Sequence, residues 1–173
     1  IEEGVEVKRP EIGVLIEVPA AVYQARLLAK EADFMAVGSN DLTQYLLAVD
    51  RNNPRVADLY QEVHPAVIAA LRDVARAAHA EERPLGICGE LAGTPAGAIL
   101  LMAMGYHVLS MNATHLLRVK WVIRNIKRSD ARRMLARVLQ MDTAEEVTAF
   151  LHKDMVRLGL GKVMPARSIT QLH

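Results

Sequence analysis

Four side chains that can handle cations, anions or protons stand at the ends of short apolar runs in this sequence. Glu17 is near the end of the run IGVLIEV, Asn40 and Asp41 follow DFMAVGS, and Cys88 lies at the end of PLGICG. Carboxylates are ligands for hard cations such as Mg²⁺, which keeps open positions for water or a phosphate. A thiol can act as a general acid or as a nucleophile.

The elements that must position these side chains alternate along the chain. The apolar runs have the length of strands and lack clean alternation, which is typical of parallel strands covered on both faces. Apolar residues at helical spacing separate them, and Pro65 suits a first helical turn. The alternation predicts a parallel α/β sheet. The predicted strands cover 12–18, 33–39, 84–89 and 107–112, and the predicted intervening helices cover 20–31, 65–80 and 95–104.

In such folds, function lies beyond the carboxyl ends of the strands, so the terminal side chains of separate runs are expected to converge. Glu17 and Asp41 end successive runs, and two neighbouring carboxylates repel each other unless a cation or a proton lies between them. The alternative is that each carboxylate caps a helix. Arg51, in VDRNN, is a candidate for phosphate or carboxylate recognition, although a surface salt bridge explains this arginine better when it is taken alone.

Cys88 is the only cysteine of the chain. One interpretation is a buried small hydrophobe, as cysteines often are. The other is chemistry, because glycine follows it and allows a ligand to approach closely. His64 reads as a satisfied loop histidine before Pro65, and the other histidines show no metal-ligand spacing.

The remaining segments are predicted to be mostly helical. Short helices are expected within 41–64, over the carboxyl ends of the strands, and a helical tail is expected over 114–158. In that tail, Ser129 or Asp130 is a candidate cap for the helix 129–140. The sequence TAEE at 143–146 resembles a capping box.

Composition limits the partners and the compartment. The 173 residues carry a net charge of +1, with 51% hydrophobic, 24% charged and 4% aromatic residues. These values fit one globular domain and favour neither nucleic acid nor a membrane surface. No apolar run is long enough to span a membrane. One cysteine cannot form an internal disulfide, so we expect a reducing compartment, the cytoplasm.

Several motifs together resemble the phosphoenolpyruvate (PEP)-binding domain of Enzyme I of the phosphotransferase system. They are GVLIEVPAA, VGSNDLTQYLLAVDRNN, HPAV and GICGELAG, in that order, and the resemblance covers about residues 10 to 126. VYQARLLA, AVDRNNPRVADLY and LSMNAT are most similar to the nitrogen-type Enzyme I. Pyruvate phosphate dikinase and PEP synthase are relatives of this family.

The resemblance implies a role for each site residue. Glu17 and Asp41 would bind Mg²⁺, and Asn40, Asp41 and Arg51 would form the substrate site for PEP. Cys88 would be the general acid that protonates enolpyruvate as phosphate leaves. The phosphate acceptor in the family is a histidine on a different domain, which passes phosphate to a phosphocarrier protein similar to HPr. The family usually has an aspartate where this sequence has Thr94, so we expect a changed loop contact there.

The family domain is a (β/α)₈ TIM barrel, and the four βα units over residues 1–173 match its C-terminal half, followed by C-terminal helices. A typical barrel needs about 250 residues. We therefore expect a fragment with little or no phosphotransfer on its own, and open sheet edges that favour a homodimer. The alternatives are a dikinase or synthase relative, and a non-catalytic dimerisation or regulatory module.

Overall fold

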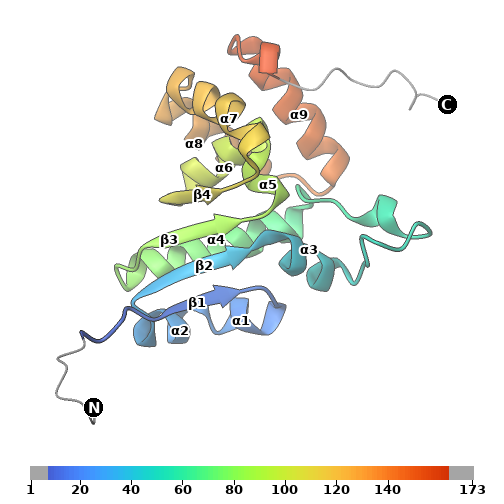
Figure 1. Ribbon diagram of the computed structural model, residues 1–173. Coiled ribbons are helices and arrows are strands. Elements are labelled where there is room, and N and C mark those ends of the chain that lie inside the picture. Colours follow the sequence, from blue (N-terminus) through green and yellow to red (C-terminus); the bar gives the residue numbers. More distant parts are fainter. Residues whose placement is uncertain (1–7, 164–173) are drawn as a thin grey trace.

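A parallel four-stranded sheet forms the centre of the protein (Figure 1). The structure is a computed structural model that describes residues 8–163. Its strands pair in the order β1-β2-β3-β4, so each strand pairs with the next along the chain. Each strand lies inside the run predicted for it, which confirms the α/β class with four βα units. The strands are β1 (Gly13–Ile16), β2 (Phe34–Gly38), β3 (Leu85–Cys88) and β4 (Val108–Ser110).

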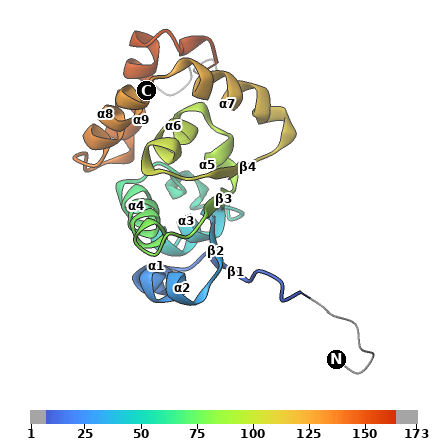
Figure 2. The ribbon, with the colours of Figure 1, turned by 90° about the vertical axis from the view of Figure 1, so that its left-hand side faces the viewer.

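The helices between the strands cover one face of the sheet (Figure 2). Helix α4 begins at Pro65, as predicted, and the nearly all-apolar α6 is largely buried. The predicted helix 20–31 is instead two helices, because Gln24 leaves helical geometry (φ −101°, ψ 7°). The covering helices are α1 (Pro19–Tyr23), α2 (Ala25–Glu31), α4 (Pro65–Ala80) and α6 (Pro95–Met104).

Burial alternates along the strands between the two faces of the sheet. The helix-covered face holds the core, where each buried aliphatic side chain contributes about 1.5–3 kcal/mol. The buried strand residues are Ile16, Met35, Val37, Leu85 and Ile87. Among residues 8–163 no element covers the opposite face, and Leu15, Phe34 and Val108 are exposed on it. Only one face is therefore packed, whereas the sequence pattern predicted strands covered on both faces.

Three short helices lie beyond the carboxyl ends of the strands. Helix α3 (Ser39–Leu47) follows β2 directly, and α5 (Glu90–Gly93) follows β3 after Gly89. The connector between α3 and α4 contains the 3₁₀ turn η1 (Ala57–Leu59) and extends past the strand ends in Figure 1. These elements confirm the short helices expected within 41–64.

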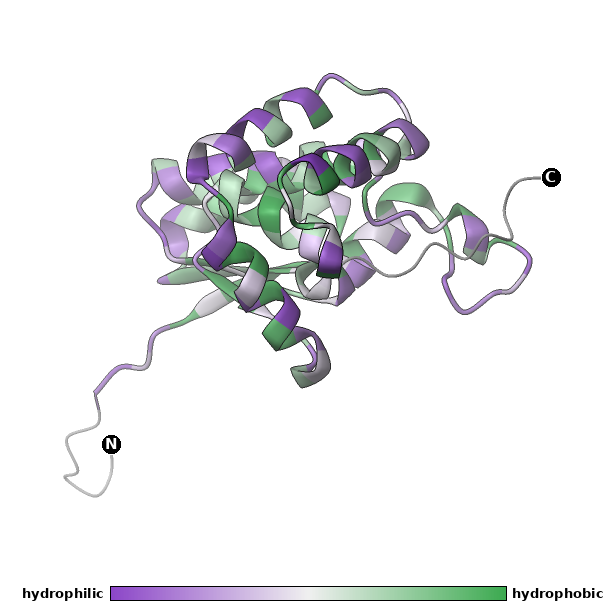
Figure 3. Cartoon of the chain, turned by 90° about the horizontal axis from the view of Figure 1, so that it is seen from above, coloured by the Kyte–Doolittle hydropathy of each residue, from purple (hydrophilic) through white to green (hydrophobic). Residues whose placement is uncertain are grey.

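The C-terminal helices pack as a separate layer at one end of the sheet (Figure 1). Seen from above, apolar residues gather inside and the outer helical surfaces are largely hydrophilic (Figure 3). The helices are α7 (Ala113–Asn125), α8 (Arg128–Val138) and α9 (Ala144–Arg157), followed by η2 (Gly161–Val163). Over residues 8–163, no helix combines the length and apolarity needed to cross a membrane.

The caps in this layer match the prediction in part. Thr143 caps α9, because its Oγ1 accepts a hydrogen bond from the Glu146 N–H at 3.2 Å. Glu146 in turn accepts from the N–H of Asp142, one residue earlier than a standard capping box requires. The prediction for α8 was wrong. Lys127 is its N-cap residue, without a side-chain bond, and the helix already includes Ser129 and Asp130.

Candidate functional site

The carboxyl ends of the strands bring the predicted site residues to one edge of the sheet. Register pairs Gly38 with Cys88, and Cys88 with Ser110. The Glu17 side chain lies over Gly38, with its Oε1 in the space that a Cβ atom at position 38 would fill. Glycine at the end of β2 thus lets this carboxylate approach the residues that open α3.

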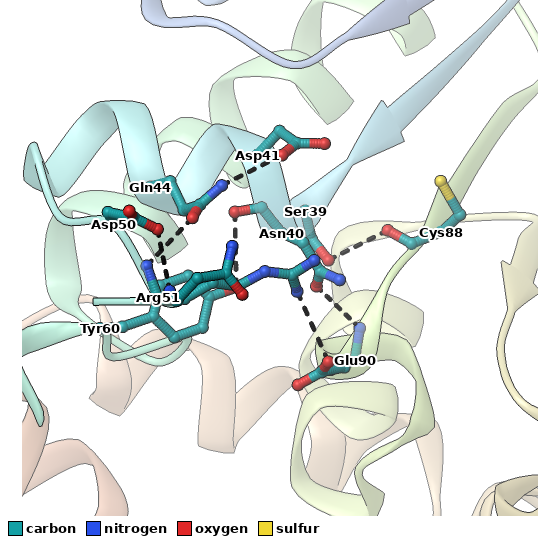
Figure 4. Close-up of polar contacts among 10 residues, drawn as sticks. Ser39, Asn40, Asp41, Gln44, Asp50, Arg51, Tyr60, Cys88 and Glu90 are labelled. Atoms are coloured by element: carbon teal, nitrogen blue, oxygen red, sulfur yellow. Dashed lines mark hydrogen bonds and ion pairs between the residues drawn. The ribbon is translucent and has the colours of Figure 1, made fainter. Parts of the chain in front are cut away.

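Two hydrogen bonds join the end of β2 to the end of β3 (Figure 4). The Ser39 hydroxyl donates to the Cys88 carbonyl oxygen at 3.0 Å, and the Glu90 N–H donates to Asn40 Oδ1 at 3.0 Å. Gly89 lies between them with φ +124°, a conformation that favours glycine. A Cβ there would meet Ser39 Oγ and would lie 2.8 Å from Asn40 Oδ1. The close junction therefore depends on Gly89.

Gln44 connects Asp41 to the arginine loop (Figure 4). Its Nε2 donates to Asp41 Oδ1 at 3.1 Å, and its Oε1 accepts from the Arg51 N–H at 3.1 Å. Because Asp41 and Gln44 are three residues apart on α3, their side chains lie on one face of that helix. One side chain therefore fixes both the Asp41 carboxylate and the backbone that carries Arg51.

The Arg51 guanidinium lies close to α5. Its Nη1 is 3.5 Å from Glu90 Oε1, and Arg51 is half-buried whereas Glu90 is exposed. A contact this long and this exposed is weak, so an anion of higher charge can replace the carboxylate. The contact agrees with the salt-bridge alternative and leaves the guanidinium available to a ligand.

Cys88 is exposed on the uncovered face of the sheet. Its thiol donates to the Val37 carbonyl oxygen at 3.6 Å, and its own carbonyl oxygen, not the thiol, faces Ser39 (Figure 4). The interpretation of Cys88 as a buried small hydrophobe is therefore wrong. The thiol is exposed at the end of β3, and the backbone carbonyl of the same residue bonds to Ser39, which precedes the predicted substrate residues.

Two sets of hydrogen bonds hold these residues. Ser39 and Asn40 bond to the end of β3, and Gln44 bonds Asp41 to the backbone of Arg51, while the long Arg51–Glu90 contact connects the two sets. Glu17 approaches the same edge from β1 by way of Gly38. Within residues 8–163, no group of three or more His, Cys, Asp or Glu side chains is placed to hold a metal ion. A divalent cation at this edge would have two protein carboxylates and would take its other ligands from water and substrate. Mg²⁺ is commonly bound in this way.

Two residues of the connector before α4 belong to this region and were not predicted. The Tyr60 hydroxyl donates to the Asn40 carbonyl oxygen at 3.4 Å. Burial, reinforced by the nearby Glu62 carboxylate, raises the pKa of Tyr60 to about 12. Burial and then the negative charge of Glu90 raise the pKa of Glu62 to about 7, although Arg51 opposes the shift. Their sequence, LYQEV, carries no spacing that would have identified them.

Several residues of the motifs have a structural role. His64 caps α4, with its Nδ1 accepting from the Ala66 N–H at 3.1 Å, which confirms the satisfied loop histidine. Thr94 caps α6, with its Oγ1 accepting from the Gly97 N–H at 3.0 Å. Aspartate is also a favoured N-cap residue, so threonine can replace it here without disturbing the site.

A cavity of about 440 Å³ opens at the other end of the sheet, near the start of β3. His107 Nδ1 accepts from the Leu85 N–H at 3.1 Å, and His79 Nε2 contacts the Gly105 carbonyl oxygen at 3.1 Å. These bonds tie one nitrogen of each imidazole to the backbone at the start of β3 and just before β4, at the opposite end of the strands from Cys88. The cavity is therefore separate from the site at the carboxyl ends.

The protein has four sequential parallel βα units, the arrangement found in half of a (β/α)₈ barrel. Carboxylate, amide, guanidinium and thiol groups lie at the carboxyl edge of its sheet. The sequence matches the model of the PEP-utilising enzyme family, PEP-binding domain, over residues 2–128. The chain belongs to this family of PEP-utilising enzymes.

Relatives at 41–44% identity support the assignment. One is the phosphoenolpyruvate-dependent phosphotransferase system protein of Escherichia coli K12, 44% identical over 91% of this chain and 21% of its own length. Another is the phosphoenolpyruvate-protein phosphotransferase of Haemophilus influenzae, 41% identical over 87% of this chain and 26% of its own length. The multiphosphoryl transfer protein of Xanthomonas campestris is 44% identical over 83% of this chain and 17% of its own length. The chain thus spans about a quarter or less of these relatives.

Proposed function

We propose that this chain supplies the C-terminal half of a PEP site in a phosphoenolpyruvate-protein phosphotransferase. The observation that carries the proposal is that Asn40 and Arg51 both contact Glu90, just past the strand end bearing Cys88, and that Gln44 bonds Asp41 to the same arginine loop. In the complete protein, phosphate passes from PEP to a histidine on another domain and then to a phosphocarrier protein. All of residues 1–173 form part of the barrel domain and its following helices in this proposal.

Asn40 and Arg51 hold the substrate. Asn40 Oδ1 is used by the Glu90 N–H, whereas its Nδ2 has no protein acceptor among the residues that the structure describes. The amide can therefore donate to a substrate oxygen. Arg51 exchanges its long contact with Glu90 for a bidentate bond to phosphate or carboxylate.

Cys88 supplies the proton. When the P–O bond of PEP breaks and the phosphoryl group goes to the acceptor nitrogen, enolpyruvate is left as an enolate. The thiol S–H bond then breaks, the proton forms a C–H bond at the methylene carbon, and pyruvate results. The exposed position of the thiol on the uncovered face lets the enolate reach it.

Glu17 and Asp41 are the residues that would hold Mg²⁺. When bound, the ion offsets the negative charge of the phosphate oxygens and orients the transfer. Mg²⁺ commonly takes one or two protein carboxylates and completes its coordination with water and substrate phosphate, which suits this role for Glu17 and Asp41. Gln44 holds the Asp41 carboxylate in place for this role.

The uncovered face supports self-association. Leu15, Phe34 and Val108 are exposed on it, and β1 and β4 are the outer strands of the sheet. We therefore propose that the chain on its own, apart from the complete protein, forms a homodimer through this face. Sedimentation at micromolar concentration measures the mass, and a monomer would contradict the proposal. We expect little or no phosphotransfer by the chain alone.

Replacement of Cys88 in the complete protein tests the proposed function. Cys88→Ala should lower PEP-dependent phosphotransfer by about 10²- to 10⁴-fold, the usual contribution of a positioned acid. Mg²⁺ binding, measured by calorimetry, should be retained, since the thiol is not a proposed ligand. Ser110→Ala, in the neighbouring position on β4, is the matched control and should remain active. Unchanged turnover in Cys88→Ala would exclude the thiol as the proton donor.

A further inference from the structure

Glu62 is an acidic side chain whose position the proposed chemistry does not explain. It lies in the connector between η1 and α4, and its Oε1 is buried without a hydrogen-bond partner among the residues that the structure describes. A buried carboxylate oxygen without a partner is costly, because no water replaces the lost solvation. Such a group either carries a proton or has a charge nearby that stabilises it.

The groups that act on Glu62 come from α5 and from the connector between α3 and α4 itself. Glu90 on α5 places a second negative charge near it, Arg51 in the loop after α3 places a positive one, and Tyr60 lies on the same connector. The backbone of Leu91 also favours the ionised form. Among the residues that the structure describes, Arg51 is therefore the cation that acts on Glu62, and its guanidinium also lies 3.5 Å from the Glu90 carboxylate.

We propose that Glu62 is a positioning residue for Arg51 and that it couples anion binding at this arginine to the uptake of one proton. When Glu62 is ionised, it and Glu90 both attract the guanidinium. When Glu62 accepts a proton from solvent, only Glu90 competes for Arg51, and an incoming anion displaces it more readily. The inference rests on the proposed function only in taking Arg51 as a residue that binds an anion.

The coupling must act in both directions. An anion on Arg51 weakens the positive field at Glu62 and adds negative charge beside it, so the protonated carboxyl is favoured further. By linkage, proton binding then strengthens anion binding by the same factor. A shift of one unit in the pKa of Glu62 on binding corresponds to about a tenfold change in anion affinity. Burial already brings the pKa of Glu62 to about 7, so the change falls near neutral pH.

Side-chain NMR of the 173-residue chain tests the proposal. The ¹³C signal of the Glu62 carboxyl and the ¹⁵Nε signal of Arg51 are followed from pH 5.5 to 8.5, with and without sulfate, which stays a dianion over this range. We expect both signals to move with one midpoint, and sulfate affinity to fall about tenfold across it. Glu62→Gln should remove the Arg51 titration and keep the affinity at its low-pH value. Glu31→Gln, an exposed carboxylate on α2, should match the unmodified chain.

Several outcomes would overturn the proposal. One is that the ¹⁵Nε signal of Arg51 stays constant while the Glu62 carboxyl titrates. Another is that sulfate binding to the Glu62→Gln variant still depends on pH. Absence of sulfate binding at Arg51 at pH 5.5 would also overturn it. The NMR signals are recorded on the 173-residue chain with sulfate, so they do not depend on whether the complete protein transfers phosphate from PEP. Failure of the proposed function can therefore be told apart from failure of this proposal.

Discussion

Replacing Glu62 by glutamine should stabilise the protein at pH 8 and leave its stability unchanged at pH 4.5. Burial is the main reason that the pKa of this carboxyl rises from 4.5 to about 7. Between these values the folded protein holds a proton that the unfolded chain releases, so the free energy of unfolding falls as pH rises through this window. At 1.36 kcal/mol per unit, the loss is about 3 kcal/mol above pH 7. Solvent screening at the partly exposed side chain reduces this to about 1–2 kcal/mol.

Urea denaturation followed by circular dichroism measures the effect. The unmodified chain, Glu62→Gln and Glu31→Gln are compared at pH 4.5 and at pH 8. We expect Glu62→Gln to gain about 1–2 kcal/mol over the unmodified chain at pH 8 only, because glutamine stays neutral. Glu31→Gln should be unchanged at both values. Equal stability of Glu62→Gln and the unmodified chain at pH 8 would refute the reasoning.

Four further substitutions test the packing around the site and the C-terminal helices by the same denaturation assay. Gly89→Ala should lower the free energy of unfolding by about 2–3 kcal/mol, since φ is +124° and the new Cβ would meet Asn40. Gly159→Ala is the matched control. It has φ +75° but open surroundings, so it should lower the free energy of unfolding by about 1 kcal/mol. Asp154→Asn should cost about 1–3 kcal/mol at pH 7. The loss should fade as pH falls, because hydrogen bonds from two arginines hold the Asp154 pKa below its usual value and protonation removes that stabilisation. Thr143→Ala should cost about 1 kcal/mol through the lost cap. A uniform loss in both glycine variants, or a pH-independent loss in Asp154→Asn, would contradict these assignments.

Much of the fold could be predicted because its signals are local. Runs such as IGVLIEV have the length and composition of a strand, and their alternation with helical spacing specifies parallel pairing. Once the strands are parallel and sequential, their carboxyl ends must meet. The gathering of Asn40, Asp41 and Cys88 at one edge therefore follows from the sequence pattern, and their hydrogen bonds agree with it.

Other features depend on distances that a sequence pattern does not contain. Glu62 was missed because its burial depends on how the connector after α3 folds back against α5. The approach of Glu17 to Gly38 depends on the register of β1 against β2. The segment 19–31 forms two helices because one residue, Gln24, leaves helical geometry. Both halves are apolar, so the sequence pattern predicts a single continuous helix.

The sequential strand order has a consequence for how the protein is made. Because each strand pairs with the one synthesised just before it, no strand has to wait for a distant partner to leave the ribosome. Loop closure between neighbouring βα units is entropically cheap compared with the pairing of distant segments. The nascent chain can therefore add one βα unit at a time, so that β1 and β2 can pair before β3, which carries Cys88, has been translated.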